Sequence, residues 1–230
     1  MKLTSILSCT TKLAVTQRRG FTLIEFAIVA GIIGLIMGSI WVFAGQTWEN
    51  SRQRQLKSEI FTVVKNLRTY YQGQNGIPTA SGFTLLTPRL ITANIIPSDI
   101  IRTGGACNPG PSCADSPWSG DATTPATGSF GVCAWVVGQT GCPNGAVGGV
   151  APYQYFALEI RAIPQAACAK AVANNTGTDG PPGLYDVVIN TNSMLALGVI
   201  PPLPSRVMAN CNSVLSNTID FVYRVVMPQF

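Results

Sequence analysis

The sequence predicts an α+β protein in which a long N-terminal α-helix packs on a globular head with an antiparallel β-sheet. Three observations lead to this prediction. Residues 21–45 form an apolar run of membrane-spanning length, residues 46–75 continue with apolar positions at helical spacing, and strand-like runs follow in the head, residues 76–230.

The apolar run carries one charge, Glu25. Its 25 residues would extend roughly 37 Å as a helix, against about 30 Å of bilayer hydrocarbon, so a buried helix of a soluble protein is the weaker interpretation. An ionised side chain at the bilayer centre costs about 2.5–3.5 kcal/mol, which makes Glu25 a candidate functional residue.

The flank before this run, residues 1–20, is basic and contains no acidic residue. The positive-inside rule therefore predicts that residues 1–20 stay in the cytoplasm and that the chain after residue 45 is exported. A secretory signal peptide is the alternative, but its cleavage site follows the apolar run. Here Gly20 precedes the run, so a cut at Gly20 leaves a helix that begins at Phe21.

Four glycines interrupt the run: Gly31, Gly34, Gly38 and Gly45. The Gly34 and Gly38 pair has the GxxxG spacing that permits close approach of membrane helices. Because glycine is also common in single spans, a packing role and simple tolerance both remain open.

The next segment is amphipathic. Its apolar positions recur at steps of three and four: Leu56, Ile60, Val63, Leu67 and Tyr70. Charged residues are expected on the remaining, solvent face: Arg52, Arg54, Lys57, Glu59, Lys65 and Arg68. No proline occurs between Phe21 and Ile77, so one helix is predicted from about Thr22 to Gln72. Its first half must lie in a membrane or against other copies, and its second half must pack on the head.

Within the head, glycine and proline are frequent in residues 76–149, which predicts loops and turns. Strands are predicted at residues 129–137, 153–163, 184–190 and 219–226, and a short helix is predicted at residues 164–175. Roughly 150 residues are ample for a core of their own.

The run that starts at Arg18, Arg19 and Gly20 and continues Phe-Thr-Leu-Ile-Glu resembles the class III signal of type IV prepilins. The resemblance is specific over residues 17–75 and loose over the head. It implies cleavage between Gly20 and Phe21 by a membrane prepilin peptidase, N-methylation of Phe21, and assembly of the mature helix into a fibre. Residues 1–20 are then the leader, and residues 21–45 are first the membrane anchor and later the fibre core.

The resemblance also assigns Thr22 and Glu25 to assembly. Cleavage creates an α-amine at Phe21, and in a bundle of helices the carboxylate of Glu25 can neutralise the amine of a neighbour. A local role is the alternative, because an acid in the first turn of a helix is favoured by the helix dipole by up to about 1 kcal/mol.

Cysteine usage agrees with export. Of seven cysteines, Cys9 lies in the leader, and the six that remain suggest disulfides, although six allow fifteen connectivities. The leader length and the 210 residues after it resemble type IVb pilins, such as the major subunits of conjugative thin pili and bundle-forming pili, whereas a first Phe is more typical of type IVa. The late disulfide of type IVb pilins implies the pair Cys168 and Cys211. Local loops Cys107 to Cys113 and Cys133 to Cys142 are a further expectation. Zinc is disfavoured because no CxxC occurs.

Enzyme chemistry finds little support. The chain has no histidine, which excludes Ser-His-Asp and Cys-His arrangements. The acids of the head show no repeated spacing and are expected to be solvated residues at turns and strand edges: Asp99, Asp115, Asp121, Glu159, Asp179, Asp186 and Asp220. Net charge falls from +5 to +1 when the four leader cations are removed, so no nucleic-acid surface is implied. No cofactor, metal or enzymatic activity is expected.

Three functions are therefore compared. The first is a structural pilin that polymerises with itself after storage in the inner membrane and ends on a bacterial surface, where its fibre serves adhesion, conjugation or a related task. The second is a minor pilin or secretion-system pseudopilin. The third is a membrane-tethered periplasmic binding domain, which gives no reason for Glu25.

Overall fold

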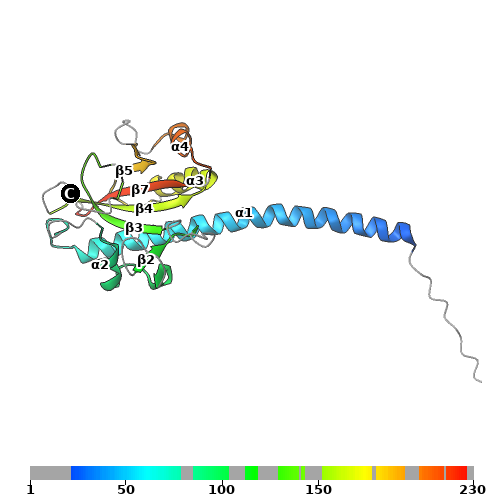
Figure 1. Cartoon of the computed structure of the whole chain (residues 1–230), viewed down its shortest axis with the longest axis horizontal. Coiled ribbons are helices and arrows are strands. Elements are labelled where there is room, and N and C mark those ends of the chain that lie inside the picture. Colours follow the sequence, from blue (N-terminus) through cyan, green and yellow to red (C-terminus); the bar gives the residue numbers. More distant parts are fainter. Residues whose placement is uncertain are drawn as a thin grey trace, which may run out of the picture. The chain divides into compact units, whose positions relative to one another are not determined.

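A computed structural model describes residues 22–78, 85–103, 112–118, 129–139, 141–142, 152–177, 180–194, 202–214 and 216–226 (Figure 1). The chain divides into two units, Met1–Gln46 and Thr47–Phe230.

Helix α1 runs from Leu23 to Tyr70 and belongs to both units. In the first unit every described residue of the helix is exposed. In the second unit the helix buries one stripe against the head, at Leu56, Ile60, Val63, Val64 and Leu67. The amphipathic spacing predicts Leu56, Ile60, Val63 and Leu67 of this stripe. Tyr70, expected on the same face, is 53% exposed because the helix ends there and the next residue, Tyr71, is buried instead. The helix ends within two residues of the expected position.

The head contains a seven-stranded antiparallel sheet in its described part, with the order β1-β2-β3-β4-β7-β5-β6. Its strands are β1 (Ile101–Thr103), β2 (Ser112–Asp115), β3 (Ser129–Trp135), β4 (Tyr155–Ile163), β5 (Leu184–Ile189), β6 (Asn192–Ser193) and β7 (Asn217–Arg224). The α+β class predicted from the sequence is confirmed, and the four predicted strands correspond to β3, β4, β5 and β7.

Three short helices and one 3-10 turn complete the described head. They are α2 (Thr87–Thr92), the 3-10 turn η1 (Ser98–Ile100), α3 (Gln165–Thr176) and α4 (Pro204–Asn210). Helix α3 is the one predicted at residues 164–175, and Pro164 occupies its N-cap position. The extended φ of proline suits the residue that precedes a helix.

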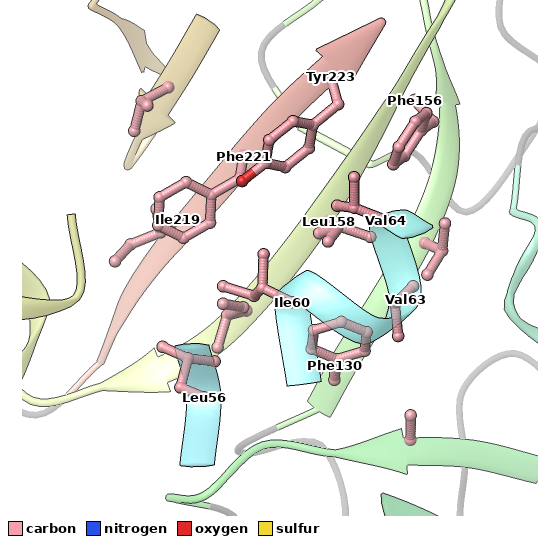
Figure 2. Close-up of a cluster of buried hydrophobic side chains, with 14 of the residues drawn as sticks. Leu56, Ile60, Val63, Val64, Phe130, Phe156, Leu158, Ile219, Phe221 and Tyr223 are labelled. Carbon is pink, nitrogen blue, oxygen red and sulfur yellow. The ribbon is translucent and has the colours of Figure 1, made fainter. Parts of the chain in front are cut away.

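The main core lies between the second half of α1 and one face of the sheet. Figure 2 shows Leu56, Ile60, Val63 and Val64 of the helix beside Phe130, Phe156, Leu158, Ile219, Phe221 and Tyr223 of the strands. Burying each aliphatic side chain of the helix stripe contributes about 1.5–3 kcal/mol, which together exceeds the net stability of many domains before entropy is subtracted.

Side chains alternate between the two faces of the sheet, and the face opposite α1 carries a second, smaller cluster of buried hydrophobic side chains. In β4, Phe156, Leu158 and Ile160 face α1, whereas Ala157 joins Cys133, Trp135, Cys142, Val188 and Val222 on the far side. Glu159, between Leu158 and Ile160, also lies on this far face because side chains alternate along a strand.

Candidate assembly site

The N-terminus of α1 is closed by a reciprocal cap. The backbone N–H and the hydroxyl of Thr22 both donate to Oε2 of Glu25, each at 2.9 Å, and the backbone N–H of Glu25 lies 3.4 Å from Thr22 Oγ1. This is a capping box, in which a Thr and a Glu three residues later satisfy each other's free backbone donors. The sequence carries a signal for this cap, Thr-x-x-Glu before an apolar run.

The cap uses only one of the two carboxylate oxygens of Glu25. Both hydrogen bonds that its carboxylate accepts go to Oε2, so Oε1 has no partner among the described residues. The side chain is exposed. The local role and a role between subunits are therefore compatible, since one oxygen holds the helix end and the other can meet a cation from outside.

The apolar half of α1 is not covered by any other described part of the chain. Its most apolar 18-residue window has a mean hydropathy of 2.4 and no buried residue, and the helix is long and apolar enough to cross a membrane by length and composition. Large side chains such as Leu23, Phe26 and Leu35 are more than two-thirds exposed. A contiguous apolar surface of this size needs lipid or protein to cover it.

No contact among the described residues requires the four glycines of this segment. A Cβ added at Gly31, Gly34, Gly38 or Gly45 would meet no atom within 4 Å. Each glycine costs the helix about 1 kcal/mol relative to alanine. Any benefit that offsets this cost must come from neighbours outside the chain, as the GxxxG interpretation requires.

Two disulfides lie in the described part of the head, and both are pairs expected from the sequence. Cys133 in β3 joins Cys142 across nine residues, and Cys168 in α3 joins Cys211, which follows α4, across 43 residues. The α3 end of the second bridge also contacts α1, because Gln53 Nε2 donates to the Ala167 carbonyl at 3.0 Å. The expected pair of Cys107 with Cys113 lies outside the described residues and side chains.

Removing the longer bridge should destabilise the head more than removing the shorter one. Loop-closure entropy assigns about 4 kcal/mol to a 43-residue loop and about 2.6 kcal/mol to a nine-residue loop. We therefore expect Cys168→Ser with Cys211→Ser to lower the free energy of unfolding, measured by chemical denaturation, by more than Cys133→Ser with Cys142→Ser. An equal or smaller loss in the first double variant would contradict this ranking.

The far face of the sheet holds a buried acid pair. Glu159 in β4 lies directly opposite Asp220 in β7, and both are almost fully buried. Arg161 donates to both oxygens of Glu159, at 2.8 and 2.9 Å. Burial, and then the Glu159 charge, raise the pKa of Asp220 well above its usual value, and its Oδ1 has no hydrogen-bond partner. The expectation that these acids are solvated is wrong, because both positions fall inside central strands.

Cys142 Sγ and the carboxylates of Glu159 and Asp220 lie within 4.8 Å of one another, a spacing that metal ligands also show. The donor set does not fit an ion. Cys142 is committed to a disulfide, and Arg161 occupies both oxygens of Glu159. Protonation of Asp220 is the simpler way to neutralise the pair.

The prediction that Glu59 lies on the solvent face of the amphipathic helix is wrong. Its side chain is 5% exposed and lies beside the buried stripe. One turn away, Gln55 Nε2 donates to Oε1 at 2.7 Å, whereas Oε2 is buried without a partner. The pKa of Glu59 is raised to about 7, mainly by burial; the hydrogen bond from Gln55 opposes this rise, and the charge of Asp99 adds to it.

The raised pKa predicts that the head is more stable in mild acid. The folded state holds the Glu59 proton more tightly than the unfolded state, so the stabilisation is complete below about pH 4.5 and is lost as pH rises through about 7. We expect Glu59→Gln to equal the wild type at pH 5 and to exceed it by about 1–2 kcal/mol at pH 8, after allowance for solvent screening. Denaturation curves at both pH values measure this.

Glu49→Gln is the matched control, since Glu49 lies on the same helix at a partly exposed position. A Glu59→Gln variant whose advantage does not change between pH 5 and pH 8 would show that the carboxyl does not titrate in this range.

The processing residues Gly20 and Phe21 lie outside the described residues, so cleavage there stays a prediction. Among the other predicted site residues, the structure brings Thr22 and Glu25 together and joins the two cysteine pairs described above.

No protein-family model matches this chain, and no curated protein matches it. Among solved structures, the crystal structure of type IV b pilin from Salmonella typhi is similar, with 19% sequence identity, a TM-score of 0.48, and coverage of 73% of this chain and 96% of that chain. A likeness of this identity and score does not establish family or function.

Proposed function

We propose that this protein is a structural subunit of a type IV pilus, of the IVb kind, that polymerises through the apolar half of α1. One observation carries the proposal: a helix with a membrane-length apolar segment, exposed on every side, begins at a capped Thr22 and Glu25 directly after the Arg18-Arg19-Gly20-Phe21 motif. Such a helix needs lipid before assembly and other copies of itself afterwards.

The same helix serves both states in this proposal. A prepilin peptidase cuts between Gly20 and Phe21, Phe21 is N-methylated, and the subunit waits in the inner membrane with its head in the periplasm. The inner-membrane assembly machinery then adds subunits to a fibre, and Glu25 of each subunit meets the Phe21 amine of a neighbour. Two charges out of water stabilise the fibre only when they are paired, so a misplaced subunit is disfavoured.

The head is suited to exposure outside the cell. Among the described residues, one disulfide closes the loop after β3, a second joins α3 to the residue after α4, and α1 provides one layer of the core. A structural role for the head is supported by the acids on the far face of the sheet, because Arg161 pairs with Glu159 and burial raises the pKa of Asp220.

Deletion of the gene tests this proposal. We expect electron microscopy of the host bacterium to show loss of all fibres of one type, and their return when the wild-type chain is supplied. Fewer or shorter fibres would instead assign the chain as a minor pilin or pseudopilin. An unchanged set of fibres would reject the polymer and favour the tethered binding domain.

A further inference from the structure

We propose that the start of the second unit is a binding collar for anionic lipid, formed by Trp48, Arg52, Arg54 and Lys57. The collar holds the unassembled subunit at the outer surface of the bilayer. The inference requires the apolar half of α1 to lie in a membrane, but it does not require the polymer.

Trp48 lies just beyond the end of the apolar run. Trp48 follows the last residue of the apolar run, Gly45, by three positions, and the residue is 67% exposed. Tryptophan is enriched where a membrane meets water, because its apolar ring and its N–H suit the two phases. Trp48 is therefore placed in the sequence where a headgroup layer would begin.

The basic side chains that follow Trp48 are expected to tilt back toward the apolar run. Helical side chains tilt toward the N-terminus of their helix, which for this chain is the direction of the span. Arg52 shows this tilt, since its guanidinium carbon lies 5.8 Å from the centre of the Trp48 ring, one turn earlier. The charge is thus carried back to the level of the tryptophan, where lipid phosphates would lie.

The three cations point in different directions around the helix axis. At about 100° per residue, Arg52 and Arg54 point roughly 160° apart, and Lys57 is about 60° from Arg54. The exposed Arg54 and the partly exposed Arg52 and Lys57 therefore point in different directions over about 7.5 Å of the helix axis. The head covers the face that carries Gln53 and Leu56, and the three cations lie to either side of that covered face, where lipid headgroups can reach them.

The segment that contains the three cations has a net positive charge. Glu49 is the acid at this level, and Gln53 Nε2 donates to it at 3.0 Å. Glu59, the next acid, is buried in the head. Residues 48–58 therefore carry three formal positive charges and one negative charge, a net +2, which complements an anionic membrane surface.

The test uses the full chain in vesicles of phosphatidylcholine, with a trace of spin-labelled lipid that is either phosphatidylglycerol or phosphatidylcholine. Electron paramagnetic resonance then reports how much of each label is held at the protein. We expect the wild type to prefer the anionic label by roughly fivefold, the factor that one surface cation supplies, and this preference should fall when salt is raised.

The triple variant Arg52→Gln, Arg54→Gln, Lys57→Gln should lose the preference. A control variant with three cations removed from the head, Arg89→Gln, Lys170→Gln and Arg206→Gln, should keep it. Equal labels at the wild type, or an unchanged preference in the triple variant, would overturn the collar. A preference that appears only at low lipid-to-protein ratio would overturn it in favour of contact with a second copy.

Resistance of the vesicle-bound chain to alkaline carbonate separates two kinds of failure. An inserted chain without lipid preference refutes the collar and leaves the pilus proposal intact. A chain that carbonate extracts refutes the membrane position of α1, and both proposals fail together.

Discussion

Replacing Glu25 by glutamine should produce a subunit that is processed normally but forms few or no fibres. Glutamine keeps the shape of the side chain and can still close the capping box with Thr22, so the helix end survives. The negative charge is lost, however, and the Phe21 amine of the neighbouring subunit stays unpaired. Breaking a buried ion pair on one side costs about 3–5 kcal/mol, which weakens each addition of a subunit roughly 100- to 1,000-fold or more.

Thr22→Val is the matched control for this prediction. It removes the hydroxyl that donates to Glu25 but keeps the charge, and loss of a cap costs only about 1 kcal/mol. Sheared fibres quantified by gel and counted by electron microscopy should fall sharply for Glu25→Gln and Glu25→Ala and modestly for Thr22→Val. The reverse order would mean that Glu25 acts through the helix cap and not through pairing between subunits.

Replacing Gly20 by alanine should block processing completely. The peptidase that the resemblance implies cuts after this glycine, so the variant should keep residues 1–20 and should carry no α-amine at Phe21. Mass spectrometry of the membrane fraction should find a chain heavier by the whole leader, and no fibres should form.

Gly45→Ala provides the comparison, because it changes another glycine of the same chain where an added Cβ meets no atom within 4 Å. That variant should be processed like the wild type. A chain of normal mature size in Gly20→Ala would remove the prepilin assignment, since the remaining features of α1 do not need a cut at this position.

Much of the fold could be predicted because long elements carry a period. The stripe of α1 and the runs of β3, β4, β5 and β7 each repeat apolar residues often enough to define a face. Strand β1 has three residues and β6 has two, so neither contains a period to detect. They form strands because a neighbouring strand supplies hydrogen bonds, as Ile101 opposite Ala114 illustrates.

Buried acids were the part of the head that the sequence could not reveal. Glu159 is tolerated in a central strand because Arg161, two residues later on the same face, donates to both of its oxygens. Asp220 is tolerated because its pKa is raised and the neutral acid can be buried. Both reasons depend on pairing between strands, which periodicity does not specify.

At the helix end, the sequence could predict which residues matter but not how they are held. The prepilin-like motif singled out Thr22 and Glu25, and the lone charge in an apolar run gave Glu25 a physical reason. The reciprocal cap adds that one carboxylate oxygen is already used within the helix, which leaves the other for a neighbour. That division of the carboxylate follows only from the geometry.

The central claim is that the mature helix, beginning at Phe21, forms the core of a surface fibre. Shearing fibres from the host bacterium, purifying them and determining the N-terminus and mass of their main protein tests it most directly. We predict this chain, starting at N-methylated Phe21 and lacking residues 1–20. Fibres without this chain, or with a chain that retains residues 1–20, would contradict the claim.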